Sequence, residues 1–321
     1  MKPNLFIVGQ PKSGTTALHQ FLGQHPQIFM SSIKEPHFFG SDFHQESDLF
    51  YGTQRFFDFR EEAAYLQLFA KASSEKIAGE SSTNYLYSQV AAQEIYQFNP
   101  DAQIIIILRE PAKYLYSLHS HYVKFTEENE ADFTTALSLE AARKRGEFPS
   151  PRVTSPGYLY YSERVKYYEQ VKRYYDLFGA AQIKIVVFEE FQSENDQVYR
   201  EILKFLNVDP NFTPKYEAVN VNKEVKFKTI NNLVNNPLIK NISKNLLSQE
   251  FNDFVRDKIV ERFLWHQAPK ETMPKDIKEK LMRQYSSEIS RVSELIELNL
   301  EEIWGYDKLK SEVLSPKSQV S

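Results

Sequence analysis

Three short apolar runs, rich in β-branched residues, predict buried β-strands. They are NLFIVG (4–9), QIIIIL (103–108) and QIKIVVF (182–188). Each run is almost continuously apolar rather than alternating, which is typical of strands covered on both faces in a parallel sheet. A weaker candidate of the same kind is KIAGE (76–80).

Segments with helical periodicity separate these strands along the chain. TTALHQFLGQH (15–25) follows the first strand, SQVAAQEIYQF (88–98) precedes QIIIIL, and PAKYLYSLHSHYV (111–123) follows it. Pro111 suits the first position of a helix, where its missing N–H would have no partner in any case. The alternation predicts βαβ units and therefore an α/β, three-layer, P-loop-like fold with a central parallel sheet.

The second half of the chain is expected to be mostly helical. A long helix is predicted from Tyr158 to Phe178, where tyrosines recur every seven residues, and we interpret this stripe as a packing face. From residue 195 onward the pattern is helical, and Trp304 ends the last periodic run, which predicts a helical C-terminal third. The charged stretch 127–156 is expected to be a surface excursion.

The chain shows no internal repeat and no linker that would divide it. We therefore expect a single domain over residues 1–310, followed by a polar, disordered tail at 311–321.

Composition narrows the class of protein. An apolar content of 41% and a charged content of 26% fit a globular protein, and the net charge of −4 argues against non-specific nucleic-acid binding. The absence of cysteine excludes disulfides, thiolate metal sites and cysteine nucleophiles. We found no signal-peptide pattern and no apolar stretch of the roughly 20 residues that would span a membrane. These features predict a soluble, cytoplasmic protein.

The stretch VGQPKSGTTAL (8–18) is similar to a nucleotide-binding P-loop but departs from it at one position. The usual pattern is G-x-x-x-x-G-K-[ST], with lysine directly after the second glycine. Here Gly9 and Gly14 keep the spacing, whereas Thr15 occupies the lysine position and Lys12 lies inside the loop. A strand, a glycine-bearing turn and a helix still place backbone N–H groups and the helix dipole where they can bind an anion.

The end of the strand QIIIIL indicates that this anion is bound without a metal. An NTPase commonly carries a metal-binding aspartate at the end of a second strand. This strand ends in Arg109 instead, and arginine offers forked donors that suit a phosphate. The two motifs together predict a site for a phosphate-bearing nucleotide without a metal.

These motifs resemble those of sulfotransferases that use 3′-phosphoadenosine-5′-phosphosulfate (PAPS). PKSGTTAL (11–18) is similar to their 5′-phosphosulfate loop, and LREPAKYLYSLHSHY (108–122) to their 3′-phosphate segment, over a resemblance that runs from about residue 4 to 228. The resemblance implies that Lys12 stabilises the charge that builds on the bridging oxygen as the S–O bond breaks. The donor-binding residues it implies are Lys12, Ser13, Gly14, Thr15, Thr16, Ala17, Arg109 and Ser117.

The acceptor side is predicted around SSIKEPHFFG (31–40). Transfer to a hydroxyl or amine needs a base, and Glu35 and His37 would point the same way in an extended segment. KEPHFF resembles the carbohydrate-type and bacterial sulfotransferases, in which the glutamate is the base, and Ala17 replaces the tryptophan of cytosolic phenol and steroid members. We therefore expect Glu35 to be the base and Lys34 to assist at the sulfonyl group, while His37 could instead be a packed histidine.

GESSTNYLYS (79–88) resembles the segment that lines the family's acceptor cleft. Loops at the carboxyl ends of parallel strands are where such folds bind ligands, so Glu80, Thr83 and Tyr85 are candidate substrate-binding residues. The alternative is helix-capping and turn chemistry by residues 81–83.

Two further features concern the donor's 3′-phosphate and metals. The Arg-Lys-Gly triplet of cytosolic members is absent, and VNKEVKFKTINN (221–232) is the nearest basic loop, with Lys223 and Lys226 as candidates or as part of a solvated face. His119 and His121 are two residues apart on a predicted helix and so face different directions, which is unsuited to a metal.

The sequence thus predicts an enzyme that moves the sulfonyl group of PAPS to a hydroxyl or amine by metal-independent in-line displacement and releases 3′,5′-ADP. The acceptor would be a small molecule, a carbohydrate or a natural product. The alternatives are a small-molecule kinase with an atypical P-loop and a non-catalytic nucleotide-binding regulator.

Overall fold

The computed structural model describes residues 1–216, 223–225, 265–267 and 273–309. The chain forms two compact units, one comprising residues 1–216 with residues 273 onward and the other residues 217–272. In the second unit, β6 (Lys223–Val225) pairs with β7 (Trp265–Gln267) in antiparallel orientation. The first unit contains the five-stranded sheet and the described candidate site residues other than Lys223.

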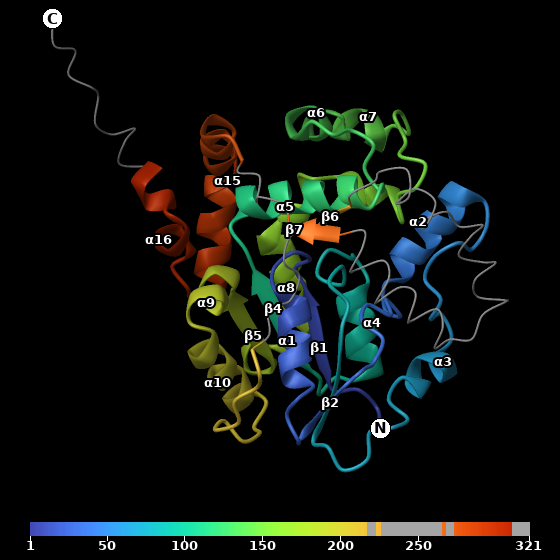
Figure 1. Ribbon diagram of the computed structural model, residues 1–321, viewed down its shortest axis with the longest axis vertical. Helices are drawn as coiled ribbons and strands as arrows, with labels where there is room; N and C mark the ends of the chain where they lie inside the picture. Colours follow the sequence, from blue (N-terminus) through green and yellow to red (C-terminus); the bar gives the residue numbers. More distant parts are fainter. Residues whose placement is uncertain (217–222, 226–264, 268–272, 310–321) are drawn as a thin grey trace, which may run out of the picture. The chain divides into compact units, whose positions relative to one another are not determined.

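A five-stranded parallel sheet lies at the centre of the first unit (Figure 1). The four predicted strands are present as β1 (Leu5–Gly9), β3 (Ile77–Ser81), β4 (Gln103–Leu108) and β5 (Ile183–Val187). The sequence did not predict β2 (Ile28–Met30), because three residues give no readable periodicity. The strand order is β2-β3-β1-β4-β5, and it confirms the predicted parallel α/β fold.

Alternate side chains of the central strands enter two separate cores. On β1, Phe6 and Val8 face one core, whereas Leu5 and Ile7 face the other. The first core is covered by α4 (Ala91–Phe98), α5 (Pro111–Lys124), α8 (Tyr167–Phe178) and α15 (Lys275–Ile296). The second is covered by α1 (Thr15–Leu22), α9 (Phe188–Ser193) and α10 (Asn195–Phe205). Both faces are buried, which is why the strands are almost continuously apolar.

Four further helices are α2 (Ser41–Tyr51), α3 (Glu62–Gln67), α6 (Phe133–Ser138) and α7 (Glu140–Lys144). The first three of them also contribute side chains to the first core. The excursion predicted for residues 127–156 contains α6 and α7 and is held together by a buried ion pair. Arg143 donates to both carboxylate oxygens of Glu128, at 2.7 and 2.8 Å. Tyr161, outside the excursion, donates to the same carboxylate at 3.0 Å and so links the pair to the rest of the unit.

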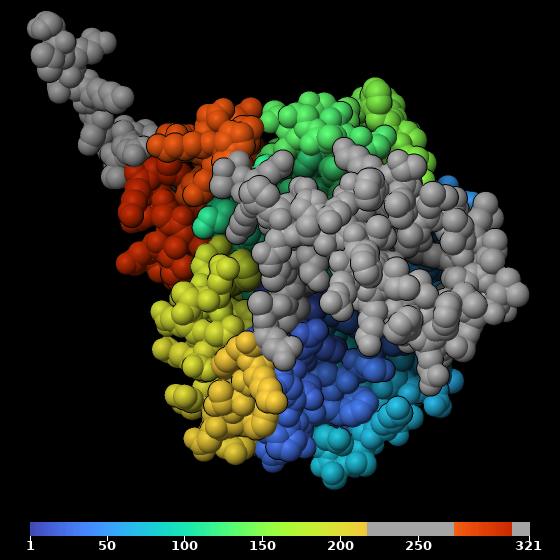
Figure 2. Space-filling view, in the orientation of Figure 1, coloured from blue at the N-terminus to red at the C-terminus, as the bar shows by residue number. Residues whose placement is uncertain are grey.

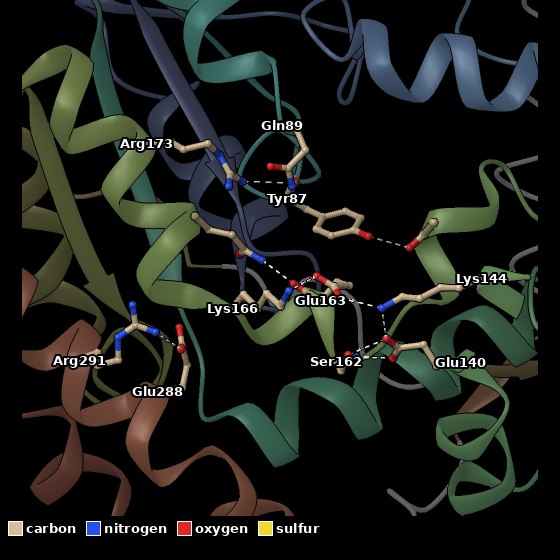
Figure 3. Close-up of polar contacts among 12 residues, drawn as sticks. Tyr87, Gln89, Glu140, Lys144, Ser162, Glu163, Lys166, Arg173, Glu288 and Arg291 are labelled. Carbon is tan, nitrogen blue, oxygen red and sulfur yellow. Dashed lines mark hydrogen bonds and ion pairs between the residues drawn. The ribbon is translucent and has the colours of Figure 1, made fainter. Parts of the chain in front are cut away.

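The prediction of a helix from Tyr158 to Phe178 is wrong over its first half. Its start forms two 3₁₀ turns, η1 (Pro156–Leu159) and η2 (Glu163–Val165), and α8 begins only at Tyr167. Carboxylates from other elements bind the backbone donors that a helix would use: Gly157 N–H donates to Glu46. Likewise, Ser162 N–H donates to the Glu140 carboxylate at 2.6 Å (Figure 3). The packing interpretation of the tyrosine stripe agrees with the burial of Tyr167 and Tyr174.

The C-terminal part of the first unit is helical, as predicted. The long helix α15 is followed by α16 (Leu300–Trp304), but helical residues continue at 306–309, so the prediction that Trp304 ends the last helical run is wrong. Among the helices that the structure describes, each is too short or too polar to cross a membrane.

Candidate active site

The loop between β1 and α1 has the geometry of an anion-binding turn. Lys12 has φ 61° and Gly14 has φ 82°, so the chain passes twice through the left-handed region. A Cβ at Gly14 would lie 3.2 Å from Phe191 and 3.3 Å from Phe188, so glycine is required there for space as well as for φ. No side chain of the described residues caps the N-terminus of α1, and its first N–H groups are therefore available to an anion.

Lys12 lies in a cationic environment. Burial, together with the nearby charges of Lys124 and Arg109, lowers the pKa of Lys12 to about 8, although the carboxylate of Glu35 opposes the shift. Neighbouring cations that repel one another are stabilised when an anion binds between them. A lysine whose pKa is lowered in this way is a candidate for an anion-binding site.

Arg109, at the end of β4, is tied to the loop. Its side chain is buried, and Nη1 donates to the carbonyl of Lys12 at 2.6 Å. Its backbone N–H donates to Gln10 Oε1 at 3.2 Å, and its guanidinium lies 4.7 Å from the ring centroid of Phe188. Its Nε is buried without a hydrogen-bond partner among the residues described, so the guanidinium has donor capacity left for a ligand.

Glu35 carries the most connected carboxylate near Lys12. Its Oε1 accepts from Lys34 Nζ at 2.5 Å and from Thr83 Oγ1 at 3.2 Å, and its Oε2 lies 3.5 Å from His37 Nε2. Burial acts against the charged form, but His37 and Lys34 outweigh it and hold the pKa of Glu35 well below its usual value. The side chain is 37% exposed, so an ionised carboxylate is accessible to an acceptor.

The segment that carries Glu35 is not extended as the sequence predicted. Glu35 has φ 60° and His37 has φ 53°, both in the left-handed region. Backbone bonds hold this conformation: Glu35 N–H donates to the carbonyl of Ser81, and His37 N–H donates to Ser82 Oγ. The two side chains therefore meet through a turn rather than through the i, i+2 geometry of a strand.

Comparison with known proteins identifies the family. A sequence model of the sulfotransferase domain matches residues 2–293. The chain belongs to the sulfotransferase domain family. The crystal structure of a sulfotransferase from Alicyclobacillus acidocaldarius is similar to this chain with a TM-score of 0.68 and 28% identity, covering 95% of this chain and 99% of that one. The predicted sulfotransferase family and the predicted α/β fold are confirmed.

Two curated relatives share parts of this sulfotransferase sequence. Bifunctional heparan sulfate N-deacetylase/N-sulfotransferase 4 from Mus musculus is 25% identical over 223 residues, which cover 65% of this chain and 23% of that protein. Carbohydrate sulfotransferase 15 from Homo sapiens is 32% identical over 178 residues, which cover 43% of this chain and 31% of that protein. The chain thus matches less than a third of the length of either relative.

The other predicted donor residues of this sulfotransferase lie on the loop, on α1 and on α5. Ser13 is fully buried, with its hydroxyl 3.4 Å from the carbonyl of Pro11. Thr15, Thr16 and Ala17 form the first turn of α1, and Ser117 is half-buried in the second turn of α5. Lys223 begins β6 of the second unit, whereas Lys226 lies outside the described residues. The donor contacts of all these residues stay predictions.

The three predicted acceptor residues differ in where they lie. Thr83 donates to Glu35, as described above. Glu80 is fully buried and accepts hydrogen bonds from Tyr65, Ser82 and Tyr85, at 3.1, 2.7 and 2.9 Å. Tyr85 is fully buried as well, so both form part of the support beneath His37 and Ser82. Their contact with the acceptor stays a prediction.

Sequence reasoning missed His121 as a member of the site. Burial and the nearby charge of Lys12 lower its pKa to about 3, with smaller contributions from Lys124 and Lys34, and Glu35 opposes the shift. The available signal was helical spacing: Ser117, His121 and Lys124 are at i, i+4 and i+7 on α5 and so share one face. The histidine was considered only as a metal ligand, and the face that it shares with Ser117 was overlooked.

We expect His121→Ala to lower kcat about tenfold, because a neutral imidazole that can exchange hydrogen bonds beside Lys12 and Glu35 is lost. Since the imidazole stays neutral above about pH 3, His121 should contribute no inflection near pH 6.5 to the wild-type kcat/KM profile. Steady-state rates with labelled PAPS measure both. An unchanged kcat in His121→Ala would remove this residue from the site.

Proposed function

We propose that this chain transfers the sulfonyl group of PAPS to a hydroxyl or amine of a carbohydrate-like acceptor and releases 3′,5′-ADP. The observation that carries the proposal is that Arg109, at the end of β4, donates to the carbonyl of Lys12 in the loop after β1, at 2.6 Å. These two cations come from separate segments, and the carboxylate of Glu35, from the segment after β2, acts electrostatically on Lys12.

In the proposed reaction Glu35 removes the proton from the attacking oxygen or nitrogen of the acceptor. A bond forms from that atom to sulfur as the bond from sulfur to the phosphate oxygen breaks. The electron pair of the broken bond stays on the phosphate oxygen, and the ammonium of Lys12 stabilises the charge there. Lys34, which donates to Glu35, is placed to balance the charge of the sulfonyl oxygens.

The donor end of the site suits a nucleotide with phosphates at both the 3′ and 5′ positions. The free N–H groups at the start of α1 would bind the 5′-phosphosulfate. Arg109, with its unsatisfied Nε, and Ser117 would bind the 3′-phosphate. Arg109 also donates to the Lys12 carbonyl, so binding at one phosphate position is mechanically linked to the other.

A carbohydrate-like acceptor is supported by the names of the relatives, which are a heparan sulfate N-deacetylase/N-sulfotransferase and a carbohydrate sulfotransferase. The carboxylate of Glu35 is 37% exposed and accepts from Thr83, so it would be accessible to a hydroxyl or amine of such an acceptor.

The test is calorimetric titration of the protein with 3′,5′-ADP and with ATP, each with and without Mg²⁺. We expect tight binding of 3′,5′-ADP that does not depend on Mg²⁺, little binding of ATP, and at least about tenfold weaker 3′,5′-ADP binding in Arg109→Gln. Metal-dependent ATP binding without preference for the 3′-phosphate would favour a kinase and reject the proposal. Binding of 3′,5′-ADP with no turnover on a broad panel of sugars and amines would favour a non-catalytic regulator.

A further inference from the structure

Part of the support for Arg109 comes from residues beyond the family match. The sulfotransferase domain model ends at residue 293, yet Trp304 and Tyr306 both hydrogen-bond to acidic residues beside the donor site. Figure 2 shows the red surface that contains α16 directly against the yellow-green surface of the α9 region. Nothing in the reaction proposed above assigns a task to this C-terminal turn.

Tyr306 holds the residue that follows Arg109. Its hydroxyl donates to Glu110 Oε1 at 2.9 Å, and both side chains are fully buried. The Glu110 carboxylate is the N-cap of α5 and accepts the backbone N–H groups of Ala112 and Lys113, at 3.0 and 2.9 Å. Burial raises the pKa of Tyr306 far above its usual value, so the hydroxyl stays a donor. Tyr306 therefore fixes the cap that sets the junction between β4 and α5.

Trp304 holds the other side of the same junction. Its Nε1 donates to Glu189 Oε2 at 2.9 Å, next to Phe188, whose ring lies under the Arg109 guanidinium. Its indole also packs 6.4 Å from the ring of Tyr167, whose hydroxyl donates to the carbonyl of Arg109 at 2.9 Å. The arginine is thus fixed through its own carbonyl, through the next residue and through the ring beneath it.

We propose that the C-terminal turn of residues 300–306 is a positioning element that aligns Arg109 for the 3′-phosphate of the donor, with Tyr306 as its principal contact. The inference rests on the proposed function, because it assigns the 3′-phosphate to Arg109. Tyr306 touches neither donor nor acceptor. Its effect passes through Glu110, and it should be confined to ligands that carry a 3′-phosphate.

The test compares 3′,5′-ADP with 5′-AMP, which lacks the 3′-phosphate, in the full-length Tyr306→Phe variant. Phenylalanine keeps the ring and removes only the hydrogen bond. We expect the Kd of 3′,5′-ADP to rise about fivefold to tenfold, the size of one lost hydrogen bond, while the Kd of 5′-AMP is unchanged. Trp304→Phe should likewise raise the ratio of the Kd of 3′,5′-ADP to the Kd of 5′-AMP.

Tyr199→Phe is the matched control. Its hydroxyl is also buried and donates to a backbone carbonyl, that of Phe21, at 3.1 Å, but it lies on α10. We expect this control to lower the melting temperature without changing the ratio of the two Kd values.

The outcomes separate this inference from the proposed function. If the wild-type protein shows no preference for 3′,5′-ADP over 5′-AMP, the proposed function itself fails. If the preference exists and Tyr306→Phe keeps it, or if both ligands weaken equally, the positioning role is overturned.

Discussion

Lys12→Ala is expected to lower kcat about a hundredfold to a thousandfold, the effect of removing one charge-stabilising donor from a transition state. The charge that Lys12 would neutralise is absent from the ground state, so the melting temperature should stay close to that of the wild type. Burial and the neighbouring cations already disfavour its protonated form, which also argues against a stabilising role for this lysine. Turnover of labelled PAPS, measured beside thermal unfolding, tests both statements.

The pH dependence of kcat/KM gives a second test of the role of Lys12. Lys12 is protonated below its pKa of about 8 and loses its charge as the pH rises through that value, so kcat/KM should fall above about pH 8. The residual activity of Lys12→Ala should lack this alkaline limb. Lys184→Ala is the matched control, since Lys184 pairs with Glu201 at 3.0 Å on β5 and should leave both rate and profile unchanged. Substantial turnover in Lys12→Ala would reject the proposed mechanism.

Glu35→Gln is expected to lower kcat about a thousandfold, because the amide keeps the shape of the side chain but cannot accept the acceptor's proton. Binding of 3′,5′-ADP should survive, since the donor is proposed to contact the loop, Arg109 and Ser117. Titration calorimetry and single-turnover rates separate the two effects.

The ionisation of Glu35 also predicts the shape of the pH–rate profile on its acid side. His37 and Lys34 hold the pKa of Glu35 below its usual value, so the carboxylate stays ionised and no acid limb is expected between pH 5 and 8. Glu75→Gln is the control, a half-buried carboxylate that accepts only local hydrogen bonds near Ser73. If Glu35→Gln keeps most of the activity while His37→Ala loses it, the base is His37.

The sequence predicted those parts of the molecule that depend on local pattern. The strands covered on both faces are continuous apolar runs, and Pro111 does begin α5. The loop with Lys12 and the strand end with Arg109 were readable because strand, turn and helix follow one another directly along the chain.

What the sequence could not predict depends on contacts between distant segments. The chain just before Tyr167 forms 3₁₀ turns instead of an α-helix, and carboxylates of Glu46 and Glu140 bind its backbone donors. Glu80 can be buried because hydroxyl groups from three separate positions donate hydrogen bonds to its carboxylate, and the sequence does not show that these positions meet. The pKa of His121 is lowered by burial and by the charge of Lys12, which lies more than a hundred residues away in the sequence.

The strand order separates the two parts of the proposed site. Lys12 and Arg109 follow β1 and β4, the middle strand and its neighbour on one side, whereas Glu35 and Thr83 follow β3's neighbour β2 and β3 itself, on the other side of β1. Under the proposed function, donor and acceptor would therefore be bound by segments from opposite sides of the middle strand. Replacing the segment after the edge strand β2 should then change which acceptor is used while donor binding is kept.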